Sequence, residues 1–264
     1  MPAQVQLDCQ DGVLTVMLNR PESGNGLDFE TGKALLAAVA DGAADTSVRV
    51  IVLLGSGGIF CSGDDLDSLR KYADGDVAAA PASADTADAF YVRICEEIVL
   101  APKPVLAAVN GVAIGPGTEI ACAADLRIGG PGSRIGCGLI RVGHVGIGAM
   151  LRRVVGPARA TEIFLSGRLV GADEAHRIGL LDRLVREDEQ VVDEALRLAR
   201  DLACGPTKAI ALYKELRERS IEQPVLSALR MQDRFHRRSH AEVADSDEGL
   251  RALLHGRKPH FTGH

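Results

Sequence analysis

Residues 107–127 read AAVNGVAIGPGTEIACAADLR, and the rest of the chain can be interpreted outward from this stretch. The short apolar run over 104–109 predicts a buried strand. Two glycine turns follow it, and a helix of small residues is expected over 117–124. Pro116 suits the first helical position, because the N–H that proline lacks would have no partner there. The stretch therefore predicts a strand, a tight turn and the N-terminus of a helix.

Such a junction has a definite electrostatic character. Free backbone N–H groups and the positive end of the helix dipole meet there. They favour an anion, or a carbonyl oxygen that gains negative charge during a reaction. Glu119 lies two residues after the turn and is a candidate acid or base. A carboxylate in the first turn of a helix also complements the dipole without any catalytic role, and this stretch alone leaves both interpretations open.

A second strand–glycine–helix junction comes earlier in the chain. Residues 49–54, RVIVLL, predict a strand that is buried on both faces. Glycines then lead into residues 60–66, FCSGDDL. We expect Asp64 and Asp65 in the first turn of a short helix, where helix capping is the alternative to a functional role.

The remaining pattern is mixed up to about residue 186 and helical after it. We expect strands over 3–9, 12–18, 125–128 and 180–185, and helices over 28–39, 85–100, 148–155, 157–166 and 172–178, the first of them capped by Asp28. We also expect a mobile loop that could serve as a lid over 72–86. Further helices are expected over 187–204, 206–219, 223–243 and 246–255. The predicted fold class is α/β, with a core over 1–186 and a helical C-terminal region over 187–264. The amphipathic spacing of these last helices suits either subunit contacts or packing on the chain's own core.

Composition excludes several functions. The chain has 264 residues, 46% of them hydrophobic, and a net charge of −6, with no basic run typical of nucleic-acid binding. No apolar stretch is long enough to span a membrane, and the N-terminus does not resemble a secretory signal, so a cytoplasmic protein is expected. The six cysteines form no C-x-x-C pair, and no residue cluster has metal-ligand spacing. We therefore expect reduced, mostly buried cysteines and no bound metal.

Three junctions taken together resemble the crotonase superfamily, also called the enoyl-CoA hydratase/isomerase family. They are LNRPE at 18–22 with Asn25 and Leu27, the FCSGDDL segment at 60–66, and the stretch from Asn110 to Ile128. The basic tail, RKPHF at 257–261, also resembles the end of family members. The ordered set covers essentially the whole chain.

The resemblance implies a spiral of ββα turns with a helical C-terminal region, and homotrimers or dimers of trimers. It implies an acyl-CoA thioester substrate without a separate cofactor. Two backbone N–H groups would hold the thioester oxygen and stabilise an enolate. By motif position the Asp64 N–H is one donor, and Glu119 matches one of the two glutamates that hydratases use as acid and base. The positions that would line the substrate and CoA path are Ser62, Gly63, Asp64, Asp65, Leu66, Pro116 and Leu139.

The chain departs from the family pattern at the second oxyanion donor. That position is Pro116, which has no N–H. Loss of one such donor costs about 3–4 kcal/mol of transition-state stabilisation. Either the oxyanion hole has one donor, or the Gly117 N–H serves as the second.

The second hydratase glutamate is also absent. Its position falls on Leu139, and the position where some isomerases carry an aspartate falls near Ile147. His144 is either a substitute acid/base group or a polar residue in a turn. The basic side chain that many members place before Asn25 is replaced by Gly24. Arg257 and Lys258 would either contact CoA phosphates or remain solvated.

These residues favour an acyl-CoA enzyme that forms or protonates a thioester enolate. A single carboxylate can move one proton between two carbons, so double-bond isomerisation fits better than hydration. Two alternatives remain open. One is a family member acting on a ketone without CoA, for example in the C–C hydrolysis of a β-diketone. The other is a non-catalytic paralogue that binds acyl-CoA.

Overall fold

A computed structural model describes residues 3–76 and 90–263 of the chain. Two sheets form its framework. The larger has six strands in the order β1-β2-β3-β4-β6-β9, with β1 and β2 antiparallel and the other neighbours parallel. The smaller joins β5, β7 and β8. The strands are β1 (Val5–Gln10), β2 (Val13–Leu18), β3 (Val50–Gly55), β4 (Val105–Val109), β5 (Val112–Ile114), β6 (Leu126–Gly129), β7 (Arg134–Gly136), β8 (Leu169–Gly171) and β9 (Arg183–Leu184).

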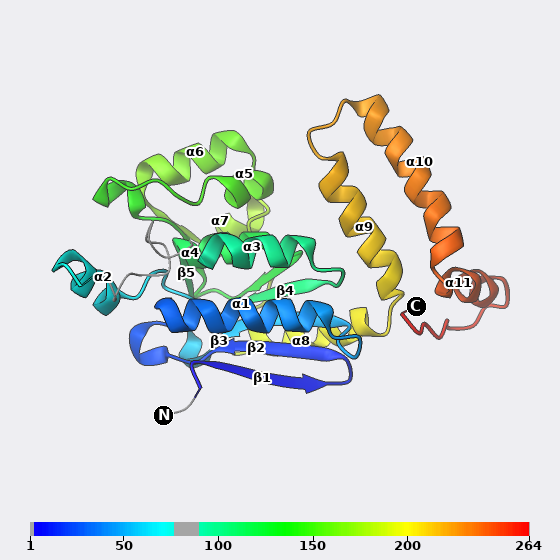
Figure 1. Ribbon diagram of the computed structural model, residues 1–264, viewed down its shortest axis with the longest axis horizontal. Coiled ribbons are helices and arrows are strands. Elements are labelled where there is room, and N and C mark those ends of the chain that lie inside the picture. Colours follow the sequence, from blue (N-terminus) through cyan, green and yellow to red (C-terminus); the bar gives the residue numbers. More distant parts are fainter. Residues whose placement is uncertain (1–2, 77–89, 264) are drawn as a thin grey trace.

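Helices surround these sheets and then extend to one side as a separate group (Figure 1). The mixed α/β architecture that the sequence predicts is confirmed. The helices are α1 (Phe29–Ala44), α2 (Leu66–Ala73), α3 (Phe90–Leu100), α4 (Pro116–Ala123), α5 (Ala149–Val155), α6 (Pro157–Ser166), α7 (Ala172–Arg177), α8 (Gln190–Ala203), α9 (Thr207–Ser220), α10 (Val225–Glu242) and α11 (Asp245–Leu254), with a short 3-10 helix, η4 (Leu139–Val142). None of the helices in the described ranges is long and apolar enough to cross a membrane.

Local sequence signals account for most of these elements. Asp11 and Gly12 both have positive φ and form the tight turn of the β1–β2 hairpin. Asp28 caps α1 as expected, since its side chain accepts a hydrogen bond of 2.7 Å from the Thr31 N–H. The sequence analysis missed β5, β7 and β8, because three-residue strands show too little alternation to be recognised.

The helix after the second glycine junction differs from the prediction. It begins at Leu66, and Asp65 is its N-cap, so Asp64 and Asp65 precede the first turn and do not lie in it. Asp65 accepts a hydrogen bond of 2.9 Å from the Ser68 N–H, which confirms the capping interpretation for this residue. Since α2 extends to Ala73, the loop expected from residue 72 starts later; residues 77–86 of that loop, and the start of the helix expected at 85, lie outside the described residues.

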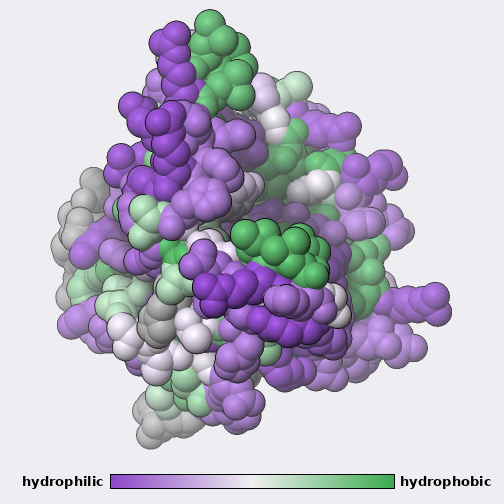
Figure 2. All heavy atoms as spheres, turned by 90° about the vertical axis from the view of Figure 1, so that its right-hand side faces the viewer, coloured by the Kyte–Doolittle hydropathy of each residue, from purple (hydrophilic) through white to green (hydrophobic). Residues whose placement is uncertain are grey.

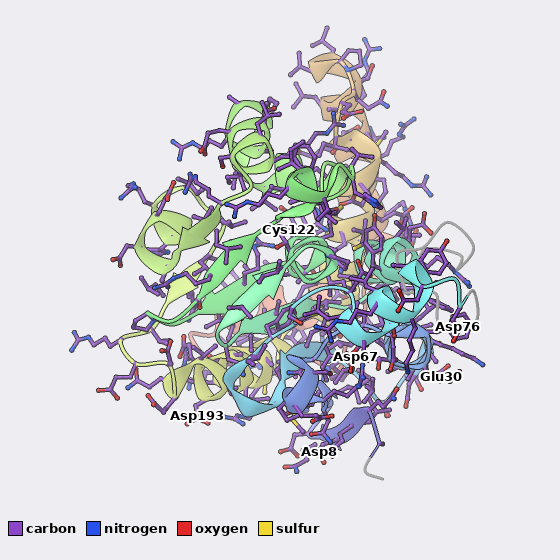
Figure 3. All side chains as sticks on the ribbon, turned by 90° about the vertical axis from the view of Figure 1, so that its left-hand side faces the viewer. Asp8, Glu30, Asp67, Asp76, Cys122 and Asp193 are labelled. Carbon is purple, nitrogen blue, oxygen red and sulfur yellow. The ribbon has the colours of Figure 1, made fainter. Side chains whose placement is uncertain are left out.

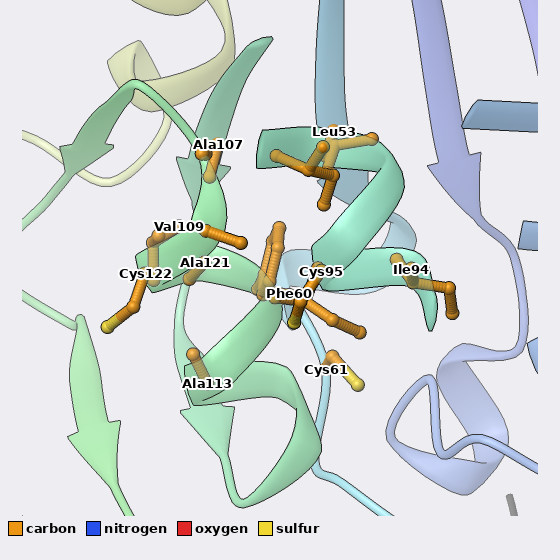
Figure 4. Close-up of a cluster of buried hydrophobic side chains, with 14 of the residues drawn as sticks. Leu53, Phe60, Cys61, Ile94, Cys95, Ala107, Val109, Ala113, Ala121 and Cys122 are labelled. Atoms are coloured by element: carbon orange, nitrogen blue, oxygen red, sulfur yellow. The ribbon is translucent and has the colours of Figure 1, made fainter. Parts of the chain in front are cut away.

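The central sheet is buried on both faces. On one face α1, α3 and α4 pack through side chains such as Leu35, Ile94 and Ile120, and this cluster contains the residues of Figure 4. On the other face α8 packs Val191 and Ala195 against the sheet. The first helix of the C-terminal region is therefore part of the core. The division at residue 187 stays a prediction, because packing alone does not test it.

The cysteines are all free, and four of the six are buried: Cys61, Cys95, Cys122 and Cys137. Figure 4 shows Cys61 and Cys95 near Phe60 and Cys122 beside Ala121, and Figure 3 places Cys122 inside the molecule while labelled carboxylates such as Asp8 and Asp193 lie at its edge. Burial raises the pKa of Cys61 and of Cys122 to about 12. These thiols behave as small apolar side chains, as expected.

A buried ionic cluster attaches α9 to the core. The Lys214 ammonium contacts the Asp125 carboxylate at 2.7 Å and donates to the Ile98 and Lys103 carbonyl oxygens. Arg217 reaches the other oxygen of Asp125 at 2.9 Å. Beyond α9, α10 and α11 extend away from the sheet, and their face carries hydrophobic areas among hydrophilic ones (Figure 2). Its exposed large apolar side chains include Val225, Leu226, Leu229, Leu250, Leu253 and Leu254.

Asp125→Asn is expected to lower the free energy of unfolding by about 3 kcal/mol, because it leaves a buried ammonium without its counter-charge. Urea unfolding at fixed protein concentration measures the change. The matched control is Asp233→Asn, which removes an exposed i,i+4 pair with Arg237 and should leave the midpoint unchanged. Equal effects of the two substitutions would contradict a stabilising role for the Asp125 cluster.

Candidate active site

The Glu119 carboxylate is buried between two helices. Glu119 lies in the first turn of α4, and its residue is only 4% exposed. Its two oxygens accept hydrogen bonds from the Met150 N–H at 3.0 Å and the Leu151 N–H at 3.4 Å. Both donors belong to the first turn of α5. The carboxylate therefore complements the dipole of α5, a helix that follows in sequence some thirty residues later, as well as that of its own helix.

This environment alters the acidity of the group. Burial raises the pKa of Glu119, and the hydrogen bonds from Met150 and Leu151 lower it without cancelling the effect of burial. The net pKa lies above the ordinary value of 4.5. A carboxyl group whose pKa is moved toward neutrality is suited to accept and return a proton.

Glu119 lines a cavity of about 570 Å³ between α3 and the start of α5. Tyr91 and Cys95 come from α3, and Ile147 and Met150 come from the loop and first turn of α5. Ile147 is buried and has φ of 51°, which is unusual for a β-branched residue. Strained backbone of this kind often occurs beside functional groups. The cavity offers an apolar space with a carboxylate in its wall.

The second glycine junction lies against the start of α4. The Cys61 N–H and C=O bond to the Val112 C=O and the Ile114 N–H at 3.0 and 2.9 Å, so residues 61–63 run beside β5. A Cβ on Gly63 would come within 2.9 Å of the Ile114 oxygen, and a Cβ on Gly117 within 2.5 Å of the Cys61 oxygen. Only glycine allows the two backbones to approach so closely.

The close packing of these two backbones bears on the two predicted oxyanion donors, the N–H groups of Asp64 and Gly117. Leu27 bonds to the Gly63 C=O at 2.8 Å and to the Asp65 N–H at 3.2 Å, and this parallel bridge directs the Asp64 N–H away from Leu27. In the first turn of α4, the Thr118 and Glu119 N–H groups both donate to the Gly115 C=O. The Gly117 N–H has no intramolecular acceptor among the described residues. Pro116 is the first residue of the helix, as expected.

Other residues predicted to line the substrate path, Ser62, Asp65 and Leu66, either bond to neighbouring parts of the chain or lie exposed at its surface. The Asp65 carboxylate caps α2 and pairs with Arg20 at 3.0 Å, and the residue is 4% exposed, so little of it remains to contact a ligand. The Ser62 N–H donates to the Gly24 C=O at 3.0 Å. Leu66 is 69% exposed at the start of α2.

Leu139 and His144 have opposite environments. Leu139 is partly buried and packs against the main core cluster. Its Cδ1 would lie 2.8 Å from a Cβ on Gly146, a residue that lines the cavity. His144 is exposed, and it does not line this cavity. The structure therefore does not support His144 as a substitute for the missing glutamate.

Sequence reasoning missed two parts of the site. The first is the pair of N–H donors at the start of α5, which no side-chain pattern reveals. The second is Tyr91, whose residue lines the same cavity as Glu119. Tyr91, Cys95 and Val99 are spaced at i, i+4 and i+8, which places them on one face of a helix. This spacing was the only sequence signal that could have linked Tyr91 to the site. No group of three or more potential metal ligands occurs among the residues that the structure describes.

Comparison with known proteins identifies the family. The family described as enoyl-CoA hydratase/isomerase matches residues 8–264. The chain belongs to this family. It is 34% identical over 257 residues to the 1,2-epoxyphenylacetyl-CoA isomerase of Escherichia coli, with 96% of each chain covered.

Solved structures of the enoyl-CoA hydratase/isomerase family have the same fold. An enoyl-CoA hydratase from Bacillus anthracis superposes with a TM-score of 0.87 at 27% identity, covering 99% of this chain and 100% of the other. An enoyl-CoA hydratase from Mycobacterium smegmatis gives a TM-score of 0.86 at 29% identity, covering 98% and 99%. The protein is thus an enzyme of the hydratase/isomerase family, and the crotonase fold expected from its motifs is confirmed.

The Glu119 carboxyl group should titrate with a midpoint above 4.5, because burial disfavours its charged form. Carboxyl ¹³C NMR can follow this titration, with Glu119→Gln used to assign the signal. A midpoint at or below 4.5 would show that the α5 N–H groups outweigh burial.

Proposed function

We propose that this enzyme forms or protonates the enolate of an acyl-CoA thioester, with Glu119 as the acid/base group. The observation that carries the proposal is the buried Glu119 carboxylate, which has a raised pKa and lines an apolar cavity beside two closely packed glycine junctions. The carboxylate takes a proton from a carbon next to the thioester or returns it. The apolar cavity accommodates the acyl group and limits access of water.

The thioester oxygen is held by the backbone N–H groups of Asp64 and Gly117. Support comes from the bridge to Leu27, which turns the Asp64 N–H away from that residue, and from the absence of an intramolecular acceptor for the Gly117 N–H within the described chain. Gly117 then supplies the donor that Pro116 lacks. Two preorganised donors stabilise the negative charge that develops on the oxygen.

Isomerisation of a double bond fits the site better than addition of water. Hydration needs a water molecule held between two carboxylates, and Leu139 occupies the position of the second one. One carboxylate suffices to move a proton between two carbons. The Escherichia coli relative, which is named as an isomerase, is consistent with this choice.

The CoA part of the substrate follows the segment from Ser62 to Leu66, and no separate cofactor takes part. Homotrimers or dimers of trimers form through the helical C-terminal region. The apolar side chains that α10 and α11 expose support such an assembly, since contiguous exposed apolar areas commonly mark protein contacts (Figure 2). In the tail, Arg257 pairs with Glu248 at 2.6 Å, which leaves Lys258 as the better candidate for a CoA phosphate.

Glu119→Gln should abolish α-proton exchange, because an amide cannot accept the proton. The purified protein is incubated with a panel of acyl- and enoyl-CoA thioesters in D₂O, and deuterium uptake is followed by mass spectrometry. Loss of a general base typically lowers such a rate by about 10²–10⁴-fold. Glu30→Gln, an exposed carboxylate on α1, is the control and should leave the rate unchanged. Thioesters that bind without any exchange would favour the non-catalytic alternative, and failure to bind them would favour a substrate without CoA.

Pro116→Ala adds an N–H at the start of α4 and tests whether the oxyanion hole lacks a donor. If Gly117 already serves, the exchange rate should change by less than about 10-fold, whereas a missing donor is worth roughly 10²–10³-fold. The rate of deuterium uptake at saturating thioester measures the effect. A gain of 10² or more would show that the native hole works with the Asp64 N–H alone.

A further inference from the structure

Two groups of α3 in the lining of the cavity can transfer protons: the phenol of Tyr91 and the carboxylate of Glu96, a residue that is exposed to solvent. Tyr91 lies near the start of α3 and lines the cavity together with Glu119 and Gly146. Its hydroxyl would lie 3.9 Å from a Cβ on Gly146, and Leu139 Cδ1 would lie 2.8 Å from the same point. The Tyr91 hydroxyl is therefore a near neighbour of Leu139. By the family resemblance, Leu139 stands where hydratases have their second glutamate.

The Tyr91 hydroxyl has no competing protein partner in the described part of the chain. It makes no hydrogen bond with any residue of 3–76 or 90–263, whereas a buried tyrosine hydroxyl usually has a partner. The other two tyrosines, Tyr72 on α2 and Tyr213 on α9, do not line the cavity, and Tyr213 is 62% exposed.

The groups around Tyr91 keep it protonated. Burial raises its pKa, and so do the negative charges of Glu119 and Asp64 and the nearby thiols of Cys95 and Cys137. A tyrosine in this setting remains a neutral phenol at physiological pH and has a proton to donate.

We propose that Tyr91 is the second catalytic residue of this enzyme and donates a proton to the substrate carbon that Glu119 does not serve. The inference rests on the enolate chemistry proposed above and deepens it. It replaces the one-carboxylate shuttle by a carboxylate and a phenol that line the same cavity.

The proton balance of an isomerisation closes with these two groups. Glu119 removes the α proton of a 3-enoyl thioester, and the electron pair of the broken C–H bond enters the dienolate. The Tyr91 O–H bond then breaks as its proton forms a C–H bond at the γ carbon, which leaves the double bond between the α and β carbons. Exchange with solvent then gives a proton to the phenolate, the stronger base, and removes one from the Glu119 carboxylic acid, so that both groups are restored.

The experiment compares two rates in the same variants. Deuterium uptake at the α carbon of saturated acyl-CoA thioesters in D₂O reports Glu119 alone, whereas conversion of 3-enoyl- to 2-enoyl-CoA thioesters, followed by ultraviolet absorbance, needs both groups. For Tyr91→Phe we expect exchange within about threefold of the unmodified protein and isomerisation slower by roughly 10²–10³-fold, the usual contribution of a general acid. Glu119→Gln should lose both rates, and Tyr213→Phe should lose neither.

Each result decides between roles. Equal losses of exchange and isomerisation in Tyr91→Phe would mean that Tyr91 only shapes the cavity, and unchanged rates would mean that Glu119 acts alone; either overturns the inference and leaves the proposed function intact. Absence of exchange in the unmodified protein, with thioester bound, overturns the proposed function and this inference with it.

Discussion

Burial of the Glu119 carboxylate against the first turn of α5 is the interaction on which the site depends. A carboxylate removed from water needs hydrogen-bond donors, and here they are the Met150 and Leu151 N–H groups. These donors are fixed by a helix and do not need to reorganise when the charge appears. The same contact joins α4 to α5 and so defines one wall of the cavity. The same hydrogen bonds therefore position the proposed acid/base group and hold α4 against α5.

A second constraint is the close approach of two backbones. Gly63 and Gly117 allow residues 61–63 to run directly beside β5 and the start of α4. The contact brings two segments that are more than fifty residues apart in sequence against each other, the one before Asp64 and the one that contains Gly117. Substitution of either glycine would push the two backbone segments apart, even though no side chain that lines the cavity would be removed.

The sequence predicted those parts of this arrangement that depend only on residues close together in the chain. Asp28 as a helix cap, Pro116 at a helix start and the buried strand before Asn110 follow from short-range rules, whereas Asp65 was expected within the first turn of its helix, with capping as only one of its two interpretations. The resemblance supplied Glu119 and the family, and the comparisons confirm the family. The α5 donors to Glu119 could not be predicted, because backbone groups leave no residue signature. Tyr91 was overlooked for a related reason. Its proposed role depends on its closeness to Leu139 and Gly146, which lie more than forty residues away in sequence and come near it only in the fold.

The buried cysteines give the site a chemical property of their own. Thiol oxidation and alkylation proceed through the thiolate, and burial raises the pKa of Cys61, Cys95, Cys122 and Cys137. At neutral pH the thiolate population of these residues is therefore very small. Cys95 lines the cavity, and its raised pKa means that its thiol should react only slowly with oxidants, with electrophiles and with a thioester bound beside it.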